Sequence, residues 1–167
     1  MECFDRADGR FIAYASEVDG SLADTNGFRD VFVRDRASGS NLLVSCDSAG
    51  VTGIGMSSEP AISGDGRFVA FKSSATNLVS GDTNRVTDIF VRDLQNGITV
   101  LGSPNAIGGP ANSNSFSPSL SSDGRWLLFR SQAKDLAAGS FSVIENLFLR
   151  DLQLATNFAL TTGGVTS

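Results

Sequence analysis

The chain has 167 residues, of which 41% are hydrophobic, so it can bury a core and is not a disordered protein. Its formal net charge is -5 and it contains only two lysines, which excludes the basic surface that nucleic acids and anionic membranes require. No apolar run approaches the ~20 residues that cross a bilayer, and the first residues lack the pattern of a secretion signal.

Several kinds of enzyme chemistry are excluded as well. The sequence contains no histidine, which removes Ser-His-Asp catalysis and histidine-ligated zinc. It has neither a Gly-x-Ser-x-Gly nucleophile motif nor a Gly-x-x-x-x-Gly-Lys phosphate loop. We therefore expect no catalytic activity. A glycan-cleaving enzyme that uses paired carboxylates, such as Asp82 and Asp88, is a remote alternative.

A two-part phrase occurs three times along the chain. Its first part, Asp-Gly-Arg followed by an aromatic residue and an apolar run, occupies 8–14, 65–71 and 123–129. Its second part, an apolar run that ends in Arg-Asp, occupies 30–35, 88–93 and 146–151. A repeat of this length predicts an array of similar structural units.

The first copy predicts its opening strand only weakly, because Cys-Phe-Asp-Arg at 3–6 stands where the second copy has Pro-Ala-Ile-Ser. This copy also holds both cysteines, Cys3 and Cys46. We expect two free, partly buried thiols, and the alternative of a disulfide stays open because spacing alone does not establish one.

The second copy shows the strand pattern most clearly. Strands are expected at 60–63, 67–72, 88–93 and 98–101, with tight turns at 64–66 and 95–97 and a long polar loop at 73–87. Asp-Gly and Asn-Gly supply the positive φ angles that tight turns need, and β-forming residues fill the strands. The third copy is complete, with its first strand at 118–121, and the sequence ends where a link to a fourth unit would follow.

These patterns predict an all-β fold, a β-propeller of three four-stranded antiparallel blades at 1–57, 58–114 and 115–167. The run from the first strand through Asp-Gly-Arg to the Phe-Val-Arg-Asp strand resembles the WD40-like repeat of TolB-type β-propellers. That resemblance implies a binding module of bacterial envelope complexes, hence a periplasmic or extracellular protein that contacts other proteins; a cytoplasmic location stays open.

Three blades do not close a ring, since propellers use about four to eight. The chain is therefore expected to be a fragment of a longer propeller, half of a six-bladed ring that two copies complete, or an open arc. The weak start favours a fragment, and the open ends predict self-association.

Strand alternation places the long loops and the links between blades at one end of each blade. Loops 16–29 and 73–87 should thus share a face with links 47–59 and 103–117, and this long-loop face is where we expect protein binding. The tight turns lie at the opposite end.

The sharpest local signal in those loops is an Asp-x-Asn-x-x-x-Asp spacing. Its oxygen atoms could hold a calcium ion, which prefers six to eight oxygen ligands, or could simply cap turns by accepting backbone N–H bonds. In the third copy Ser140, Ser142 and Asn146 stand at these positions, so a cation site there should be absent or weaker. The candidate ligands are Asp24, Asn26 and Asp30 in the first copy and Asp82, Asn84 and Asp88 in the second.

The other repeated residues are interpreted as structural. Asp35, Asp93 and Asp151 should accept backbone N–H bonds at chain reversals, and the repeated arginines should bridge blades or lie in water. Phe32, Phe90 and Phe148 should form the core. The leading hypothesis is a non-catalytic protein-binding scaffold, and the alternative is a calcium-stabilised adhesive module outside the cell.

Overall fold

The computed structural model describes residues 3–5, 9–17, 26–139 and 144–161 and contains three antiparallel four-stranded sheets there. Each sheet is a meander in which consecutive strands pair, and we call the sheets blades 1, 2 and 3. Blade 1 comprises β1 (Cys3–Asp5), β2 (Phe11–Ser16), β3 (Asp30–Asp35) and β4 (Ser40–Leu43). Blade 2 comprises β5 (Ser57–Ile62), β6 (Phe68–Ser73), β7 (Asp88–Asp93) and β8 (Ile98–Leu101). Blade 3 comprises β9 (Ser115–Leu120), β10 (Trp126–Ser131), β11 (Asn146–Asp151) and β12 (Thr156–Ala159).

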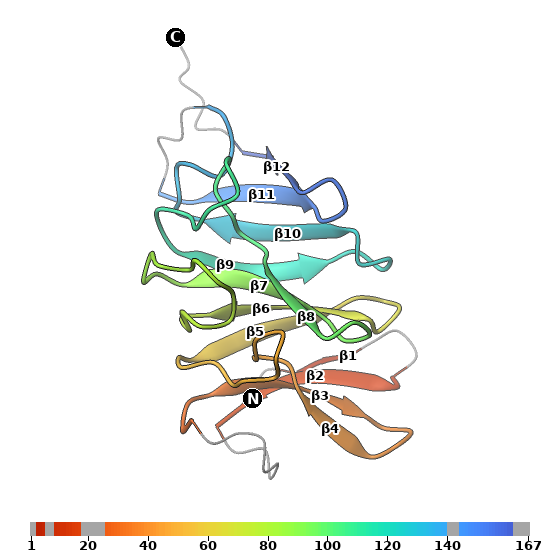
Figure 1. The fold of residues 1–167 in the computed structure, drawn as a ribbon. Coiled ribbons are helices and arrows are strands. Elements are labelled where there is room, and N and C mark those ends of the chain that lie inside the picture. The colour runs from red at the N-terminus through yellow and green to blue at the C-terminus, as the bar shows by residue number, and fades with distance from the viewer. Residues whose placement is uncertain (1–2, 6–8, 18–25, 140–143, 162–167) are drawn as a thin grey trace.

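The blades follow one another in chain order from the bottom of Figure 1 to its top. The predicted all-β fold with four-stranded blades is thereby confirmed. The weakly predicted first strand is present as β1, which is three residues long and pairs with β2. Within the described ranges, no helix is long and apolar enough to cross a membrane.

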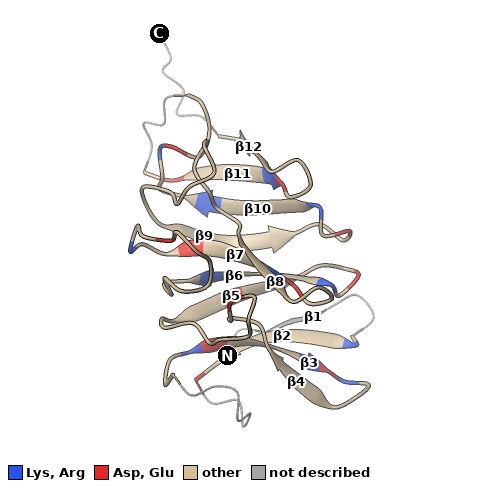
Figure 2. Cartoon of the chain, in the orientation of Figure 1, with Lys and Arg blue, Asp and Glu red and all other residues tan. Residues whose placement is uncertain are grey.

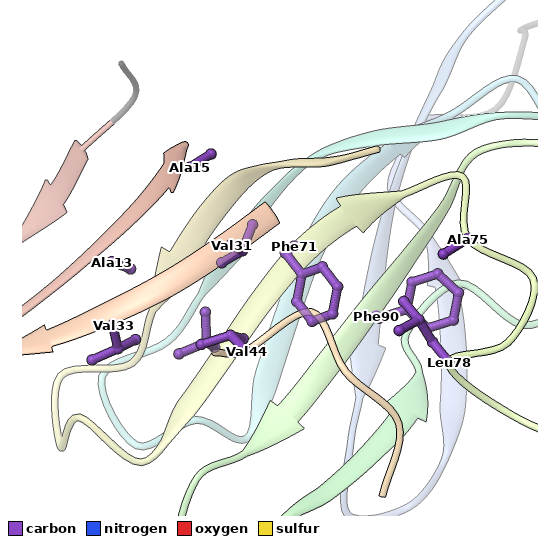
Figure 3. Packing of buried hydrophobic residues seen from close by; sticks show 10 residues of the cluster. Ala13, Ala15, Val31, Val33, Val44, Phe71, Ala75, Leu78 and Phe90 are labelled. Carbon is purple, nitrogen blue, oxygen red and sulfur yellow. The ribbon is translucent and has the colours of Figure 1, made fainter. Parts of the chain in front are cut away.

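Blades pack on one another through apolar faces that combine small and large residues (Figure 3). Ala13, Ala15 and Val31 of blade 1 belong to the same buried cluster as Phe71 and Phe90 of blade 2. Blade 2 in turn offers Ala70 and Ile89 to the blade 3 cluster. Each blade contributes one stacked aromatic pair, with ring centroids 5.6–5.9 Å apart: Tyr14–Phe32, Phe71–Phe90 and Phe129–Phe148.

The tight-turn end of each blade is closed by an ion pair between the Arg of Asp-Gly-Arg and the Asp that ends the third strand. In blade 2, Arg67 Nε and Nη2 donate to the two Asp93 oxygens at 3.0 and 2.7 Å, and Asp93 also accepts the backbone N–H of Gln95. These contacts, led by Arg67, lower the pKa of Asp93 to about 2. Figure 2 shows charges at strand ends and in loops. The equivalent pairs are Arg10–Asp35 and Arg125–Asp151.

The first strands of blades 2 and 3 each contain an irregularity that the sequence did not predict. Glu59 and Ser117, each of which precedes a proline, have φ angles of 52° and 53°, and the pairing register shifts beside them. A positive φ strains a non-glycine residue, so tertiary contacts must compensate. Glu59 Oε2 accepts the backbone N–H of Ser117 at 2.6 Å and thereby joins the two irregularities across the blades. Strand β5 extends through this irregularity and begins at Ser57, earlier than the expected residue 60.

Cys46 is a free, buried thiol near the end of blade 1. Burial raises its pKa above the usual range, so the thiol stays protonated and poorly reactive. The Cys3 side chain lies outside the described part of the structure.

Truncation of a core aromatic should test the interlocking of the blades. Phe71 is fully buried, so Phe71→Ala should lower the free energy of unfolding by about 3–5 kcal/mol. Phe28 is 42% exposed in a loop, so Phe28→Ala should change it by less than about 0.5 kcal/mol. Urea unfolding followed by tryptophan fluorescence measures both, and equal effects would contradict the packing described above.

Candidate functional site

The long loops and parts of the links between blades meet at one end of the blades, as expected. Ser73 at the end of β6 pairs with both Ser57 at the start of β5 and Asp88 at the start of β7. Backbone bonds from Ser57 to Arg29 and from Ser115 to Thr87, both 2.7 Å, join each link to the preceding long loop. We call the surface formed by residues 26–29, 52–56, 74–87, 105–114 and 132–139 the loop face.

The links depart from the expected path in one respect. Each link runs from the fourth strand of one blade, its outer strand, to the first strand of the next blade, its inner strand. On the way it passes the fourth strand of that next blade. Thr99 Oγ1 donates to the Cys46 carbonyl at 2.6 Å, and Arg92 Nη1 donates to the Asp47 carbonyl at 2.7 Å. Residues 46–48 therefore contact the third and fourth strands of blade 2, and the link reaches the loop face only from about residue 52 onward.

The predicted Asp-x-Asn spacing forms a hydrogen-bond network in blade 2. Asn84 Nδ2 donates to Asp88 Oδ2 at 2.7 Å and to the Ala111 carbonyl at 3.0 Å. Asn84 Oδ1 accepts the backbone N–H of Val86 at 3.1 Å. Ser103 Oγ donates to the other Asp88 oxygen at 3.0 Å. The network therefore fastens the long loop to both the strand β7 and the next link.

Blade 1 repeats the network with near-identical partners. Asn26 Nδ2 donates to Asp30 Oδ2 at 2.8 Å and to the Gly53 carbonyl at 2.6 Å, and its Oδ1 accepts the backbone N–H of Phe28. Ser45 Oγ donates to Asp30 Oδ1 at 2.5 Å. Asp24, the other candidate ligand in this copy, lies outside the described residues.

Blade 3 has an amide, Asn146, at the position of the buried carboxylate. Asn146 is buried, and Thr161 takes the place of the serine. Thr161 Oγ1 accepts the Leu147 N–H at 2.8 Å and lies 3.5 Å from Asn146 Oδ1. Ser140 and Ser142 lie outside the described residues. A negative charge is thus dispensable at this position of the repeat.

Burial dominates the electrostatics of the two carboxylates in blade 2. Loss of hydration raises the pKa of Asp88 to about 6, against the opposing hydrogen bonds from Asn84 and Ser103. Loss of hydration also raises the pKa of Asp82, which is only 7% exposed. Asp82 Oδ1 is buried without a hydrogen-bond partner, whereas both Asp88 oxygens accept hydrogen bonds.

This geometry matches turn capping, because in both loops the asparagine oxygen accepts a backbone N–H and its amide nitrogen faces the aspartate. The described ranges contain no group of three or more His, Cys, Asp or Glu side chains that could hold a metal ion. Calcium binding through these loops stays a prediction.

Large apolar side chains are exposed on the loop face. Ile54, Met56 and Ile107 are 61%, 55% and 93% exposed, and Phe28 is exposed as well. The segments that carry them are held by side-chain bonds, such as the one from the Ile54 N–H to Asn77 Oδ1 at 2.8 Å. The sequence signal for these residues is the presence of large apolar side chains within Gly- and Ser-rich links, a pattern that does not by itself indicate binding.

Comparison with solved structures places this arrangement among β-propellers. A protein described as TolB from Agrobacterium tumefaciens matches with a TM-score of 0.60 at 17% identity, over 96% of this chain and 50% of that one. The β-propeller domain of the Trilobed protease from Pyrococcus furiosus matches with a TM-score of 0.57 at 17% identity, over 95% and 42%. Dipeptidyl peptidase 4 from Porphyromonas gingivalis matches with a TM-score of 0.57 at 12% identity, over 96% and 25%.

The fold is that of a TolB-like β-propeller. No family model and no curated protein matches the sequence at a significant level. The TolB-like propeller described here spans about half the length of the Agrobacterium protein. The same fold occurs in TolB and in propeller domains of peptidases, so the TolB-like propeller is a scaffold shared by proteins of different function.

The buried Asp88 should make stability depend on pH in a direction unusual for an aspartate. Its pKa rises from the usual 3.8 to about 6 on folding, so the native state holds the proton more tightly than the unfolded state. Stability should therefore fall by up to about 3 kcal/mol between pH 4 and 6 because of Asp88. Asp88→Asn should remove this contribution and leave only the part that the raised pKa of Asp82 supplies.

Asp93 provides the contrasting variant for this test, because its pKa is lowered to about 2 on folding. Its stabilising effect is present above pH 4 and is lost as the pH falls toward 2, so Asp93→Asn should keep the fall between pH 4 and 6. Urea unfolding across pH 2 to 8 measures both. A fall between pH 4 and 6 that is as large in Asp88→Asn as in the wild type would disprove the assignment.

Proposed function

We propose that this chain is a non-catalytic propeller segment that binds protein partners through the loop face. The observation that carries the proposal is the exposure of Ile54, Met56 and Ile107 on segments that hydrogen bonds hold in place. Exposed apolar side chains on a preorganised surface favour protein binding, because they bury area without the entropy of ordering a loop.

The structural neighbours support this proposal in two ways. TolB supports a binding module, and by that resemblance a periplasmic or extracellular location. The peptidase matches include propeller domains of larger proteins, and the absence of histidine from this sequence favours a binding role over a catalytic one. Both groups are compatible with a propeller that presents a surface to another protein or domain.

Calcium binding is the second candidate, and the orphaned Asp82 oxygen favours it. Asp82 Oδ1 is buried without a partner, and the charge of Asp82 raises the pKa of the neighbouring Asp88. A cation between the two carboxylates would relieve both effects. The role of such an ion would be to stabilise an adhesive or structural module.

Loss of the exposed apolar side chains should abolish protein binding at the loop face. Peptides selected from a random display library against the chain should bind it in solution. The triple variant Ile54→Ser, Met56→Ser, Ile107→Ser should weaken them at least tenfold, because it removes three of the four large apolar side chains that are exposed on the loop face. The matched variant Leu42→Ser, Leu154→Ser changes exposed side chains elsewhere and should bind normally.

Isothermal titration measures both sets of affinities, and circular dichroism checks that each variant is folded. Failure to select any binding peptide, or equal affinity for the triple variant and the wild type, would refute the loop face as a protein-binding surface.

Calcium should raise the melting temperature if the second candidate is correct. At saturating calcium against EDTA we expect a rise of roughly 5 °C or more. Asp24→Asn combined with Asp82→Asn should remove this rise. Asp123→Asn, at the tight-turn end, should keep it. Identical melting curves with calcium and with EDTA would exclude the site and leave the capping role alone.

A further inference from the structure

The arginine before the final Asp of each third strand has a different environment in each blade. Arg34 in blade 1 is exposed and donates to Asn41 at 3.2 Å. Arg92 in blade 2 donates from Nη1 to the Asp47 carbonyl at 2.7 Å and to Thr99 Oγ1 at 2.9 Å. Acceptors within the chain therefore bind the guanidinium group of Arg92.

Arg150 in blade 3 has a side-chain acceptor but no bond to a carbonyl of the link. It donates from Nη1 to Asn157 Oδ1 at 2.8 Å, but its Nε is buried without a hydrogen-bond partner. Burial lowers its pKa, and no carboxylate forms an ion pair with it among the described residues. Asn105 stands where Asp47 stands in the preceding link, and both carbonyls accept an N–H of their own turn, from Gly108 and Gly50. The Asp47 carbonyl also accepts Arg92 Nη1, whereas Arg150 donates to a side chain, Asn157 Oδ1. A partly buried guanidinium with an unpaired N–H and no counter-charge is unfavourable without an anion or a further acceptor.

A groove between blades 2 and 3 opens beside this side chain. It has a volume of about 310 Å³, at the lower end of the range for small-molecule sites. Its lining is mainly apolar, and Ile98 and Val100, which are about half exposed, face it from the outer strand of blade 2. The one carboxylate in the lining, Asp93, is already bound by Arg67 through two hydrogen bonds. The groove is lined by Phe68, Val91, Ile98, Val100, Leu101, Leu152 and Ala155 in addition to Asp93 and Arg150.

We propose that this groove binds a small organic carboxylate with a short apolar group. The carboxylate would accept hydrogen bonds from the Arg150 guanidinium, which lines the groove, and the apolar group would lie against Phe68, Val100 and Leu152. Arginine suits this role because its planar fork matches a carboxylate and stays charged when partly buried. The net charge of -5 disfavours anions in general, so the apolar contact must supply part of the affinity.

The site is distinct from the loop face, since its lining comes from the tight-turn halves of β6, β7 and β11 and from β8. The equivalent groove between blades 1 and 2, lined by Phe11, Val33 and Leu42, has no orphaned arginine. It therefore serves as an internal control within the same molecule.

Hexanoate is the probe, and the arginine Nε–H signals in a ¹H–¹⁵N NMR spectrum are the readout. The Arg150 signal is assigned by its absence from Arg150→Gln. Hexanoate should shift this signal in a saturable way with a millimolar dissociation constant, because the ligand is small and the groove open. Acetate, hexan-1-ol and phosphate should bind at least tenfold more weakly, since each lacks one half of the proposed contact.

Two substitutions test the contacts, with backbone amide shifts as the readout common to all variants. Arg150→Gln should weaken hexanoate at least tenfold, and Arg92→Gln should leave it unchanged. Val100→Gln, at an exposed position that should not affect folding, should weaken hexanoate severalfold while the Arg150 signal remains visible.

Each opposite result overturns the proposal. If hexan-1-ol binds as tightly as hexanoate and Arg150→Gln does not weaken either ligand, the groove is an apolar pocket that does not recognise anions. Equal shifts with acetate or phosphate would mean an adventitious ion only. Binding of a short acidic peptide tenfold more tightly than hexanoate would assign the groove to a protein partner. No shift of the Arg150 signal at tens of millimolar hexanoate would mean that the unpaired N–H of Arg150 has no ligand-binding role.

Discussion

The packing of one sheet on the next is the constraint on which the rest of the structure depends. A four-stranded meander has two faces and cannot bury either alone, so each blade needs its neighbours. Small residues on one blade, such as Ala13 and Ala70, leave room for the stacked aromatic pair of the next. Leu128 of blade 3, at the position of Ala70, is only half-buried because no described blade covers that face.

Much of the fold could be predicted from local patterns. The strands at 88–93 and 98–101 are found at the expected residues, because turn glycines and alternating apolar residues define them locally. The predicted start of β5 was wrong by three residues. Glu59 precedes a proline and has a positive φ angle, a conformation that its local sequence does not favour. That conformation is joined to Ser117 of the next blade, and such a tertiary contact leaves no local signal.

Some of the residues that form the candidate site could be predicted from the sequence, but the orientation of their side chains and their remaining partners could not. The spacing drew attention to Asn84 and Asp88 as possible cation ligands or turn caps, and in the structure a 2.7 Å hydrogen bond joins their side chains. It could not indicate that the amide nitrogen rather than the oxygen faces the carboxylate. Nor could it identify Ser103, which lies 15 residues from Asp88 and approaches it only after the sheet has formed.

The repeat also explains why one position can acquire a new role. When a unit is copied, each side chain keeps its strand position, but its surroundings depend on the link that crosses it. Arg92 donates to a carbonyl of the link before its blade, which also accepts an N–H of its own turn, whereas Arg150 donates to the side chain of Asn157. The sheet places both guanidinium groups alike, and the link determines which one is left with an unused donor. Differences between copies, rather than their shared residues, are therefore where specific binding chemistry is to be sought in this chain.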